Sequence, residues 1–382
     1  MCNIIIESNA IQNLVENLQE NYKNQNLAFV TTKKDYLKNK NNLQPFKDNV
    51  ANVKMCYIDE CVKCNEIFVK LLENQLKDCS VIICFGSGYL VDLVKIVATK
   101  MHLKYIVVPS GLSYGNYISK NAVFLDNNYY ATNIATLAPE SLYVDTEILL
   151  KSNSKDVGGL FALVLSYNLM VCKMLYSGVS ESEIDDFKQL LKGVNIFTSE
   201  NIVLKEGKTK LFKLLLEIQL WLSNRNMLSN IDLIVSLFNK FYNSNNFSFG
   251  EIGLIFSILI LTLHEKIITN KICVPSLNIG KRVERIKTLF AKQETVETVL
   301  RNFESNIDEF DGFVVQKEIY LKNIQNALWR VQNNLSMLKR IYVDKGVVYS
   351  NINIDNFYKT LSVACDIIND KYLSVLSVIG AV

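Results

Sequence analysis

The sequence has 382 residues, 49% of them hydrophobic, and is long enough to bury a full core in two domains or lobes. Its 41 basic and 38 acidic residues leave a net charge of +3, which is too small and too evenly spread for a surface built to bind nucleic acid or an anionic membrane. We therefore exclude both kinds of partner.

The amino-terminal segment MCNIIIESNA has an acidic residue and polar interruptions, unlike the basic start and unbroken apolar core of a signal peptide. The most apolar run, residues 254–263, is far shorter than the roughly 20 residues that cross a bilayer, and it indicates a buried helix. Nine cysteines without an export signal indicate reduced thiols and a cytoplasmic protein. Cys61 and Cys64 form a C-x-x-C near Cys56, but no second pair or histidine completes a zinc set, so we favour plain thiols.

Short β-rich runs alternate with amphipathic stretches up to about residue 150, which predicts a mainly parallel sheet with helices between its strands. The predicted strands are residues 27–32, 53–58, 81–85, 105–109 and 141–145. From about residue 157 onward the sequence has long runs of helical period, at residues 158–176, 209–222 and 319–343. We predict an α/β domain over residues 1–155 and an all-helical domain over 156–382, joined at the polar segment KSNSKDVGG.

The most informative stretch is VIICFGSGYLVDLVK, in which a buried strand leads into Gly86-Ser87-Gly88 and then an amphipathic helix. Such a turn presents backbone N–H groups and the positive end of the helix dipole to an anion, and therefore favours a pyrophosphate. Glycine is needed because a Cβ would block the approach of the phosphates and because such turns visit positive φ. The third glycine of the common dinucleotide fingerprint is absent, since Val91 stands there, so the turn alone is a weak signal and could equally be a plain strand-to-helix connection.

The residues that follow this turn strengthen the signal. Asp92 and Lys95 come at helical spacing, and after one more strand the chain reads PSGLSYGNYIS over residues 109–119. Together these blocks resemble the superfamily of glycerol-1-phosphate dehydrogenase, glycerol dehydrogenase, iron-dependent alcohol dehydrogenases and dehydroquinate synthase. Later blocks, among them SLYVDTEIL and DKYLSVLSVIGAV, extend the resemblance over nearly the whole chain with less specific motifs.

The resemblance implies a Rossmann-like α/β domain followed by an all-α domain, as in the dehydroquinate synthase fold, with NAD or NADP as cofactor. Gly86, Ser87 and Gly88 would hold the pyrophosphate, Asp92 would support the turn, and Lys95 would complete the cofactor site. Ser110, Ser113 and Ser119 would line the nicotinamide side, and residues 27–36 would supply the adenosine edge. A small polyol or polyol phosphate would be the substrate, and a homo-oligomer is one possible assembly.

The resemblance also implies a catalytic zinc or iron, held by one Asp and two His, and the sequence departs from that pattern. Gly159, Leu233 and Phe249 stand at or beside the three ligand positions, and the D-G pair of the first domain is replaced by Gly115-Asn116. The whole chain has only two histidines. His102 lies before a strand and is expected at the surface, whereas His264 ends an apolar run and is expected to be a satisfied or boundary residue.

We therefore predict that the family metal is absent, although a relocated site built from Asp156, Asp232 and His264 stays open. The first hypothesis is an NAD(P)-dependent oxidoreductase without metal, in which Tyr114, Tyr117 and Lys120 are the candidates for the acid or base. For each of the three we favour a surface position on a loop over that role. The second is a pseudoenzyme of the same fold that binds nucleotide or a protein partner. A cyclase like dehydroquinate synthase is the least favoured, because its reaction also uses the metal.

Overall fold

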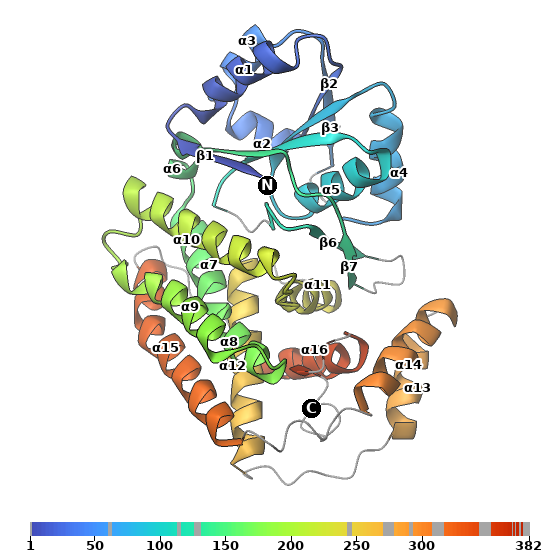
Figure 1. Ribbon diagram of the computed structural model, residues 1–382, viewed down its shortest axis with the longest axis vertical. Coiled ribbons are helices and arrows are strands. Elements are labelled where there is room, and N and C mark those ends of the chain that lie inside the picture. The colour runs from blue at the N-terminus through green and yellow to red at the C-terminus, as the bar shows by residue number, and fades with distance from the viewer. Residues whose placement is uncertain are drawn as a thin grey trace. The chain divides into compact units, whose positions relative to one another are not determined.

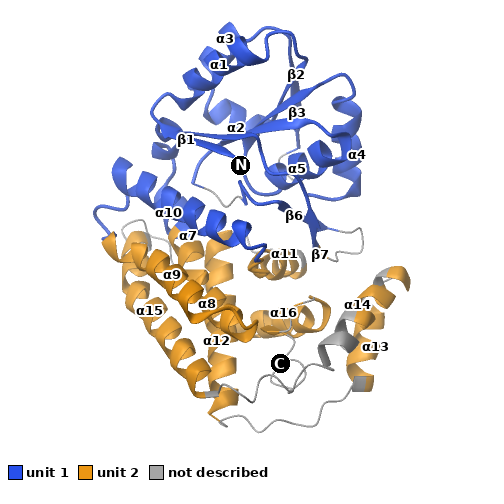
Figure 2. Cartoon of the chain, in the orientation of Figure 1, with its two compact units in different colours: residues 1–127, 132–160, 197–227 blue, residues 128–131, 161–196, 228–382 orange. Residues whose placement is uncertain are grey.

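The computed structural model describes residues 2–59, 63–112, 116–125, 131–242, 247–269, 279–289, 293–307, 317–343, 353–368, 370, 372, 373 and 376. The chain divides into two compact units, which Figure 2 shows in different colours. Unit 1 comprises residues 1–127, 132–160 and 197–227, and unit 2 comprises 128–131, 161–196 and 228–382. The domain boundary between residues 155 and 156 rests on a change of sequence pattern, a different criterion, and it stays a prediction.

The strands form one parallel sheet and one small strand pair. They are β1 (Asn3–Glu7), β2 (Leu27–Thr32), β3 (Val53–Ile58), β4 (Val81–Gly86), β5 (Lys104–Pro109), β6 (Asn121–Leu125), β7 (Ala131–Ala135) and β8 (Ser141–Asp145). The large sheet has the order β1-β8-β5-β4-β2-β3, and β6 pairs with β7. All five predicted strands lie in the large sheet, which confirms the predicted α/β fold class.

Helices cover both faces of this sheet, as the run of buried positions in its central strands requires. Helices α1 (Ala10–Asn21) and α3 (Gln44–Asn49) lie on one face, and α4 (Glu66–Gln75) and α5 (Tyr89–Met101) lie on the other (Figure 1). Every residue of β2 and β4 is buried. On the α1 side, the ring of Phe29 lies 4.6 Å from that of Phe46 and 6.0 Å from that of Phe85, which joins the sheet to α3.

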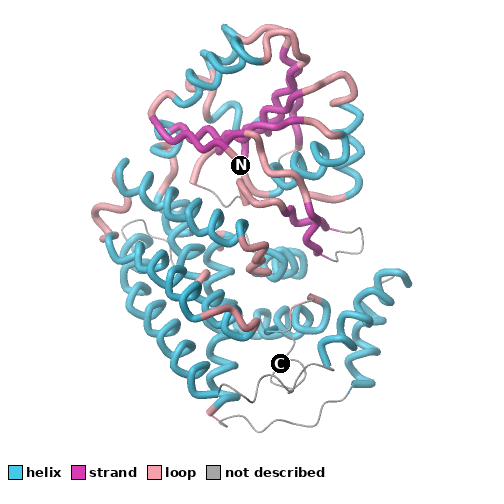
Figure 3. Tube along the Cα trace, viewed as in Figure 1, coloured by secondary structure: helices cyan, strands magenta, loops and turns pink. Residues whose placement is uncertain are grey.

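Three further helices belong to unit 1, namely α2 (Lys33–Lys38), α6 (Thr146–Leu150) and α10 (Lys205–Asn224). Helix α7 (Ser154–Ser166) runs from unit 1 into unit 2. The helices of unit 2 are α8 (Asn168–Tyr176), α9 (Glu181–Leu191), α11 (Ile231–Phe241), α12 (Phe249–Ile268), α13 (Ile279–Leu289), α14 (Gln293–Ile307), α15 (Lys317–Val343) and α16 (Ile354–Ile367), with a 3-10 turn at Lys192–Ile196. Beyond β8 the described residues contain helices and no strand (Figure 3), which confirms the predicted all-helical region.

The apolar helices of this region are core helices. The range Ser154–Tyr176 has the length of a membrane span, and an 18-residue window within it has a mean hydropathy of 1.6. However, 94% of that window is buried inside the protein. The predicted single run over 158–176 is in fact two helices, because α7 ends at Ser166 and α8 begins at Asn168. The apolar run 254–263 lies within α12, as predicted, and Ser248 and Glu251 form a capping box at the start of that helix.

The cysteines of the described residues are free thiols, and most of them are buried. Cys64 is fully buried, and burial raises the pKa of its thiol well above the ordinary value. Cys61 lies outside the described residues. A buried thiol with a raised pKa is a poor nucleophile, so Cys64 behaves as a small apolar residue in the core.

Candidate functional site at the carboxyl edge of the sheet

The carboxyl ends of β2, β4 and β5 meet at one edge of the sheet, with β4 in the middle. The chain leaves β2 toward β3 on one side, and leaves β4 toward β5 on the other. The connections therefore diverge between β2 and β4. In open parallel sheets, ligands bind beyond the carboxyl ends of the strands at such a divergence. The fold thus places the predicted turn, Gly86-Ser87-Gly88, where a ligand site is expected.

The backbone of this turn explains its glycines. Gly88 precedes α5 with φ 57° and ψ −133°, a region that only glycine occupies without strain, and no side chain caps the helix start. A Cβ on Gly86 would lie 2.5 Å from Leu90 Cδ2, so only glycine lets the chain turn this closely into the helix. Ser87, between them, is half-buried. The dipole of the 13-residue helix α5 is thus directed at this turn and would favour an anion there.

Asp92 and Lys95 follow the turn on α5, and both side chains are buried. The Lys95 ammonium donates hydrogen bonds to the carbonyl oxygens of Asn116 and Asn121 and to Ser119 Oγ, at 3.0 Å for Asn121 and 3.1 Å for Ser119. Lys95 therefore fixes the segment after β5 to the helix that begins at the turn. A direct contact of Asp92 or Lys95 with a cofactor stays a prediction.

The predicted serines occupy different positions around this segment. Ser110 is buried directly after β5, and its N–H donates to the carbonyl of Gly86 at 3.3 Å, which links it to the turn. Ser119 is also buried, and its hydroxyl donates to the carbonyl of Asn121 at 2.9 Å in addition to accepting from Lys95. Ser113 lies outside the described residues. Ser110 is thus the serine that the structure brings to the glycine turn, whereas Ser119 helps to anchor the segment.

Asp35 lies at the same edge, within the segment 27–36 that was expected to supply the adenosine edge, although no role was predicted for its side chain. Thr32 Oγ1 donates to Asp35 Oδ2 at 3.1 Å, and the N–H of Asp35 donates back to Thr32 Oγ1 at 3.0 Å, which caps α2. Burial raises the pKa of Asp35, and the side chains of Ser110 and Thr32 partly oppose that rise. An acidic residue soon after a predicted strand was the available signal.

The candidate acid–base residues differ in their exposure to solvent. Tyr117 is fully buried, its ring lies 5.6 Å from that of Phe212 on α10, and burial raises its pKa. The expectation of a surface loop position is therefore wrong for Tyr117, because its ring completes the packing between the segment after β5 and α10. Lys120 is exposed, and its carbonyl accepts from the N–H of Thr136 at 2.8 Å. Tyr114 lies outside the described residues.

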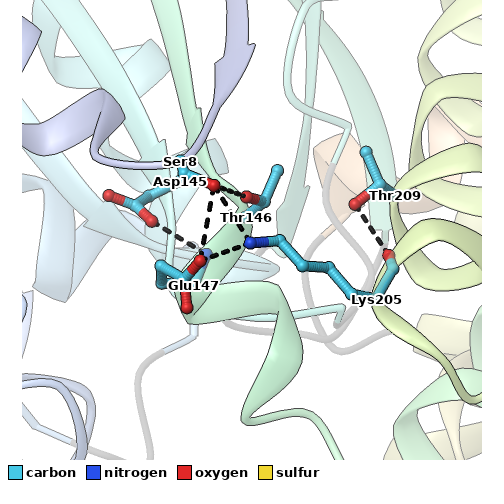
Figure 4. Close-up of polar contacts among 6 residues, drawn as sticks. All are labelled: Ser8, Asp145, Thr146, Glu147, Lys205 and Thr209. Carbon is cyan, nitrogen blue, oxygen red and sulfur yellow. Dashed lines mark hydrogen bonds and ion pairs between the residues drawn. The ribbon is translucent and has the colours of Figure 1, made fainter.

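Helix α10 is anchored at the same edge of the sheet, at the ends of β1 and β8 (Figure 4). Lys205 donates to Ser8 Oγ at 3.0 Å and forms an ion pair with Glu147. Asp145 caps α6 by accepting from the N–H of Glu147 at 2.9 Å, and it also accepts from the N–H of Ile11 at 3.3 Å. The ion pair is half-exposed, so its contribution to stability is small. This cluster positions α10, whose Phe212 then supports Tyr117.

The residues at the family's metal-ligand positions do not fit a metal. Gly159 is buried in α7, Leu233 is buried in α11, and Phe249 begins α12, and none of these side chains has a donor atom. Within the described residues, no three His, Cys, Asp or Glu side chains form a group that could hold a metal ion. We therefore derive no catalytic step through a metal.

The residues of the relocated metal site have other partners. Asp156 and Asn153 cap the start of α7 with reciprocal hydrogen bonds. Asp232 lies in the first turn of α11. His264 is fully buried, stacks on Tyr372 with ring centroids 4.0 Å apart, and its Nε2 donates to the Tyr372 carbonyl at 3.0 Å. Burial lowers the pKa of His264 to about 3. His264 is thus a packed core histidine, and His102 is exposed, as predicted.

Comparisons with known proteins agree with the predicted resemblance. Residues 5–152 match the sequence profile of the family described as iron-containing alcohol dehydrogenase. A glycerol-1-phosphate dehydrogenase (NAD(P)+) from Methanosarcina barkeri is 29% identical over 117 residues, which are 28% of this chain and 33% of that protein. Its counterpart from Methanosarcina mazei is 30% identical over 108 residues, 26% of this chain and 30% of that protein. The match spans about a third of the length of these curated relatives.

The fold likeness extends over the whole chain. An alcohol dehydrogenase from an archaeal halo-thermophile of a Red Sea brine pool has a TM-score of 0.59 at 14% identity, covering 98% of this chain and 96% of that chain. A probable glycerol dehydrogenase from Sinorhizobium meliloti has a TM-score of 0.55 at 12% identity, covering 100% and 98%. Residues 5–152 are thus similar to the iron-containing alcohol dehydrogenase family, as their motifs predicted, and the fold of the whole chain is similar to that of these two dehydrogenases.

Proposed function

We propose that this chain is an NAD(P)-dependent oxidoreductase that acts on a small polyol or polyol phosphate without the divalent metal of its relatives. The observation that carries the proposal is the turn from β4 to α5 at the divergence point of the sheet, with its glycine in a conformation reserved for glycine. The curated relatives that match this region are named as NAD(P)+ enzymes, which supports a nicotinamide dinucleotide as the ligand.

The proposal gives each described residue a definite task. The backbone of Gly86, Ser87 and Gly88 would hold the pyrophosphate against the start of α5. Ser110 would face the nicotinamide half, since its N–H is already bonded to the turn. Lys95 would hold the segment after β5 in place through the carbonyls of Asn116 and Asn121 rather than touch the cofactor. A rigid segment beside the cofactor limits the loss of entropy on binding.

Hydride transfer from an alcohol carbon to the nicotinamide also requires that a proton leave the hydroxyl. Among the described candidates, Lys120 is the exposed one and Tyr117 is buried in a core contact. Lys120 is therefore the candidate that we would test first as a proton acceptor. We place the protein in the cytoplasm, because its described cysteines are free thiols.

A specific observation favours a second function, that of a pseudoenzyme which binds nucleotide or a protein partner without catalysis. The predicted ligand positions carry Gly159, Leu233 and Phe249, and none of these side chains has an atom that could bind a metal. A fold does not guarantee its chemistry. On this alternative the turn after β4 would still bind a nucleotide, but no turnover would follow.

A fluorescence titration of the purified chain with NADH and NADPH tests both functions. Saturable binding of one cofactor below about 1 mM, the upper end of ordinary cofactor-site affinities, would support a nucleotide site. Absence of saturable binding of either cofactor would refute the dehydrogenase. The titration also decides between NAD and NADP.

A second measurement separates the enzyme from the pseudoenzyme. The chain, with its bound cofactor, is offered a panel of polyols and polyol phosphates, and reduction of NAD(P)+ is followed by absorbance. Turnover in protein shown by elemental analysis to contain no zinc or iron would support the metal-independent enzyme. Cofactor binding without turnover would support the pseudoenzyme, and stoichiometric zinc or iron would refute the proposed loss of metal.

A further inference from the structure

One face of helix α10 reaches the segment after β5 at two places. Lys208 and Phe212 are four residues apart on α10, so their side chains lie on the same face of that helix. Phe212 contacts Tyr117 directly. Lys208 is 7% exposed, and its ammonium donates to the carbonyl oxygens of Leu150 and Ser152, at 2.9 Å and 2.7 Å. The Lys208 contacts therefore connect α10 to the end of α6 within unit 1.

Ser152 extends this connection to the segment after β5. Its hydroxyl oxygen accepts a hydrogen bond from the N–H of Leu112 at 2.9 Å, and both residues are buried. The same oxygen would lie 3.4 Å from a Cβ on Gly111, so the two stretches of chain are in close contact here. Two residues before Leu112, the N–H of Ser110 donates to the carbonyl of Gly86. This short segment is therefore held by the glycine turn at one residue and by Ser152 two residues later.

Capping of α6 does not account for the whole arrangement. A lysine near the end of a helix often bonds the last carbonyls, and the bond to Leu150 is of that kind. Ser152, however, lies beyond the end of α6, and its hydroxyl is bonded to a residue 40 positions away in the sequence. An exposed lysine could cap this five-residue helix without the cost of removing its ammonium from water. The bond to Ser152 explains the buried position of Lys208, because it fixes the residue that holds Leu112.

We infer that Lys208 is a positioning residue of the candidate site, which acts through Ser152 to hold residues 110–112 against the glycine turn. Its consequence for the cofactor rests on the proposed function, in which Ser110 faces the nicotinamide half. Loss of the Lys208 ammonium or of the Ser152 hydroxyl should loosen the segment and weaken its contacts with that half. A ligand without nicotinamide should be affected little, because the turn itself is built at the start of α5.

The first measurement does not depend on any ligand. Hydrogen exchange, followed by mass spectrometry of fragments that cover residues 104–112, is compared between the parent chain, Lys208→Met and Ser152→Ala. Both variants should exchange about tenfold faster in this fragment, because the Leu112 N–H loses its acceptor or the contact that fixes the acceptor.

Two variants control for general effects of such substitutions. Lys210→Met makes the same change at an exposed position of α10. Ser166→Ala removes a buried hydroxyl that is bonded to the Leu163 carbonyl in its own helix. Neither control should change the exchange of residues 104–112. Faster exchange of this fragment in the controls as well, or unchanged exchange in Lys208→Met and Ser152→Ala, would overturn the inference.

The second measurement asks what the segment does for the cofactor. Dissociation constants of NADH and ADP are determined for the same proteins by isothermal titration calorimetry. Lys208→Met and Ser152→Ala should each weaken NADH binding about tenfold, the effect of losing one well-placed hydrogen bond, and should change ADP binding less than about twofold. Because Lys208 acts through Ser152, the double variant should bind NADH no more weakly than Ser152→Ala alone. Equal weakening of NADH and ADP would show general damage to the turn and would overturn the inference.

Failure of this inference and failure of the proposed function give different results. If the parent chain binds no NADH, the dehydrogenase is refuted, and hydrogen exchange alone decides whether Lys208 holds the segment. If the parent binds NADH and the variants bind it equally well, the nucleotide site stands and the positioning role is overturned. If Lys208→Met does not fold, Ser152→Ala, which removes one hydroxyl and leaves the ammonium in place, decides the same comparison.

Discussion

The carboxyl edge of the sheet in unit 1 and the surroundings of His264 in unit 2 use their polar residues in opposite ways. In unit 1, Lys95 and Ser110 are bonded to backbone around a turn that ends in Gly88. In unit 2, His264 is stacked on Tyr372, and the neighbouring Asp370 is paired with Lys173. The first arrangement shapes an edge where ligands are expected, while the second locks the end of the chain into a helical core.

The difference shows where the resemblance to a dehydrogenase is strongest. The blocks that most closely resemble the dehydrogenase motifs, residues 86–95 and 109–119, form the turn and the segment that supports it. The predicted metal-ligand positions are in the helical region, where the sequence has the apolar residues Leu233 and Phe249. Gly88 keeps a backbone conformation that favours glycine, so the turn before α5 retains the geometry that the resemblance predicts.

The largest effect is expected from breaking the buried ion pair of unit 2. Lys173 Nζ lies 2.7 Å from Asp370 Oδ2, and the side chains are 18% and 3% exposed. Burial alone would raise the pKa of Asp370, but Lys173, Asn230 and the backbone N–H of Leu373 together lower it. Lys173→Met leaves that carboxylate without its cation and should cost about 3–5 kcal/mol of unfolding free energy, as measured by urea denaturation.

An exposed ion pair of the same unit provides the control. Lys188 lies 2.9 Å from Asp185 Oδ1 on the same helix, and the Asp185 side chain is 64% exposed. Lys188→Met should cost less than about 1 kcal/mol, because solvent screens such a pair. Equal losses in the two variants would contradict the view that the Lys173 pair locks the core.

The second effect is a pH dependence that belongs to His264. Its pKa is lowered by burial to about 3, below the ordinary 6.5, so the folded chain keeps it neutral while the unfolded chain takes up a proton. Stability should therefore fall as the pH drops below 6.5, by about 1.4 kcal/mol per pH unit from this group alone. Urea denaturation between pH 7 and 5 should show that His264→Gln removes this slope.

The chain has one other histidine, which makes the comparison clean. His102 is exposed at the end of α5, so His102→Gln should keep the full slope of the parent protein. A slope that persists in His264→Gln would show that other groups, and not the buried imidazole, cause the loss of stability.

The fold was largely predictable because its signals are local. The predicted strands 27–32 and 53–58 coincide with β2 and β3 residue by residue, since each is a β-rich run bounded by polar residues. Strand β1 (Asn3–Glu7) was not predicted, because its apolar run has only three residues, Ile4 to Ile6. The break between α7 and α8 was missed as well, because it lies within one continuous apolar run.

The candidate site was predictable only where its chemistry is local. The Gly86-Ser87-Gly88 turn follows from a strand, two glycines and a helix in direct succession. The contacts of Lys95 follow from the fold, because its partners are distant in sequence and come near it only when parallel strands end at one edge. Tyr117 was misjudged for the same reason, since its packing partner Phe212 belongs to α10.

A third, smaller effect tests the turn itself. Gly88→Ala places a Cβ at φ 57°, which should cost about 1–3 kcal/mol and should also abolish nucleotide binding, because the N–H groups at the start of α5 would be displaced. Gly178→Ala is the control: it has φ 73° in unit 2, and a Cβ there would meet no atom within 4 Å. The control should lose stability and retain NADH affinity, as measured by fluorescence titration.

The smallest effect concerns the stability of unit 1 and the sign of its pH dependence at Asp35. Burial raises the pKa of this carboxyl above its ordinary 3.8, so the folded chain holds the proton to higher pH than the unfolded chain does. The contribution of Asp35 is therefore fully present below pH 3.8 and is lost as the pH rises through the raised value. The His264 contribution changes in the opposite direction, falling as the pH is lowered. As the pH rises from 3.5 to 6, the unfolding free energy of Asp35→Asn should therefore increase relative to that of the parent. A difference between the two proteins that is constant across this range would show that Asp35 has the same pKa in the folded and the unfolded chain.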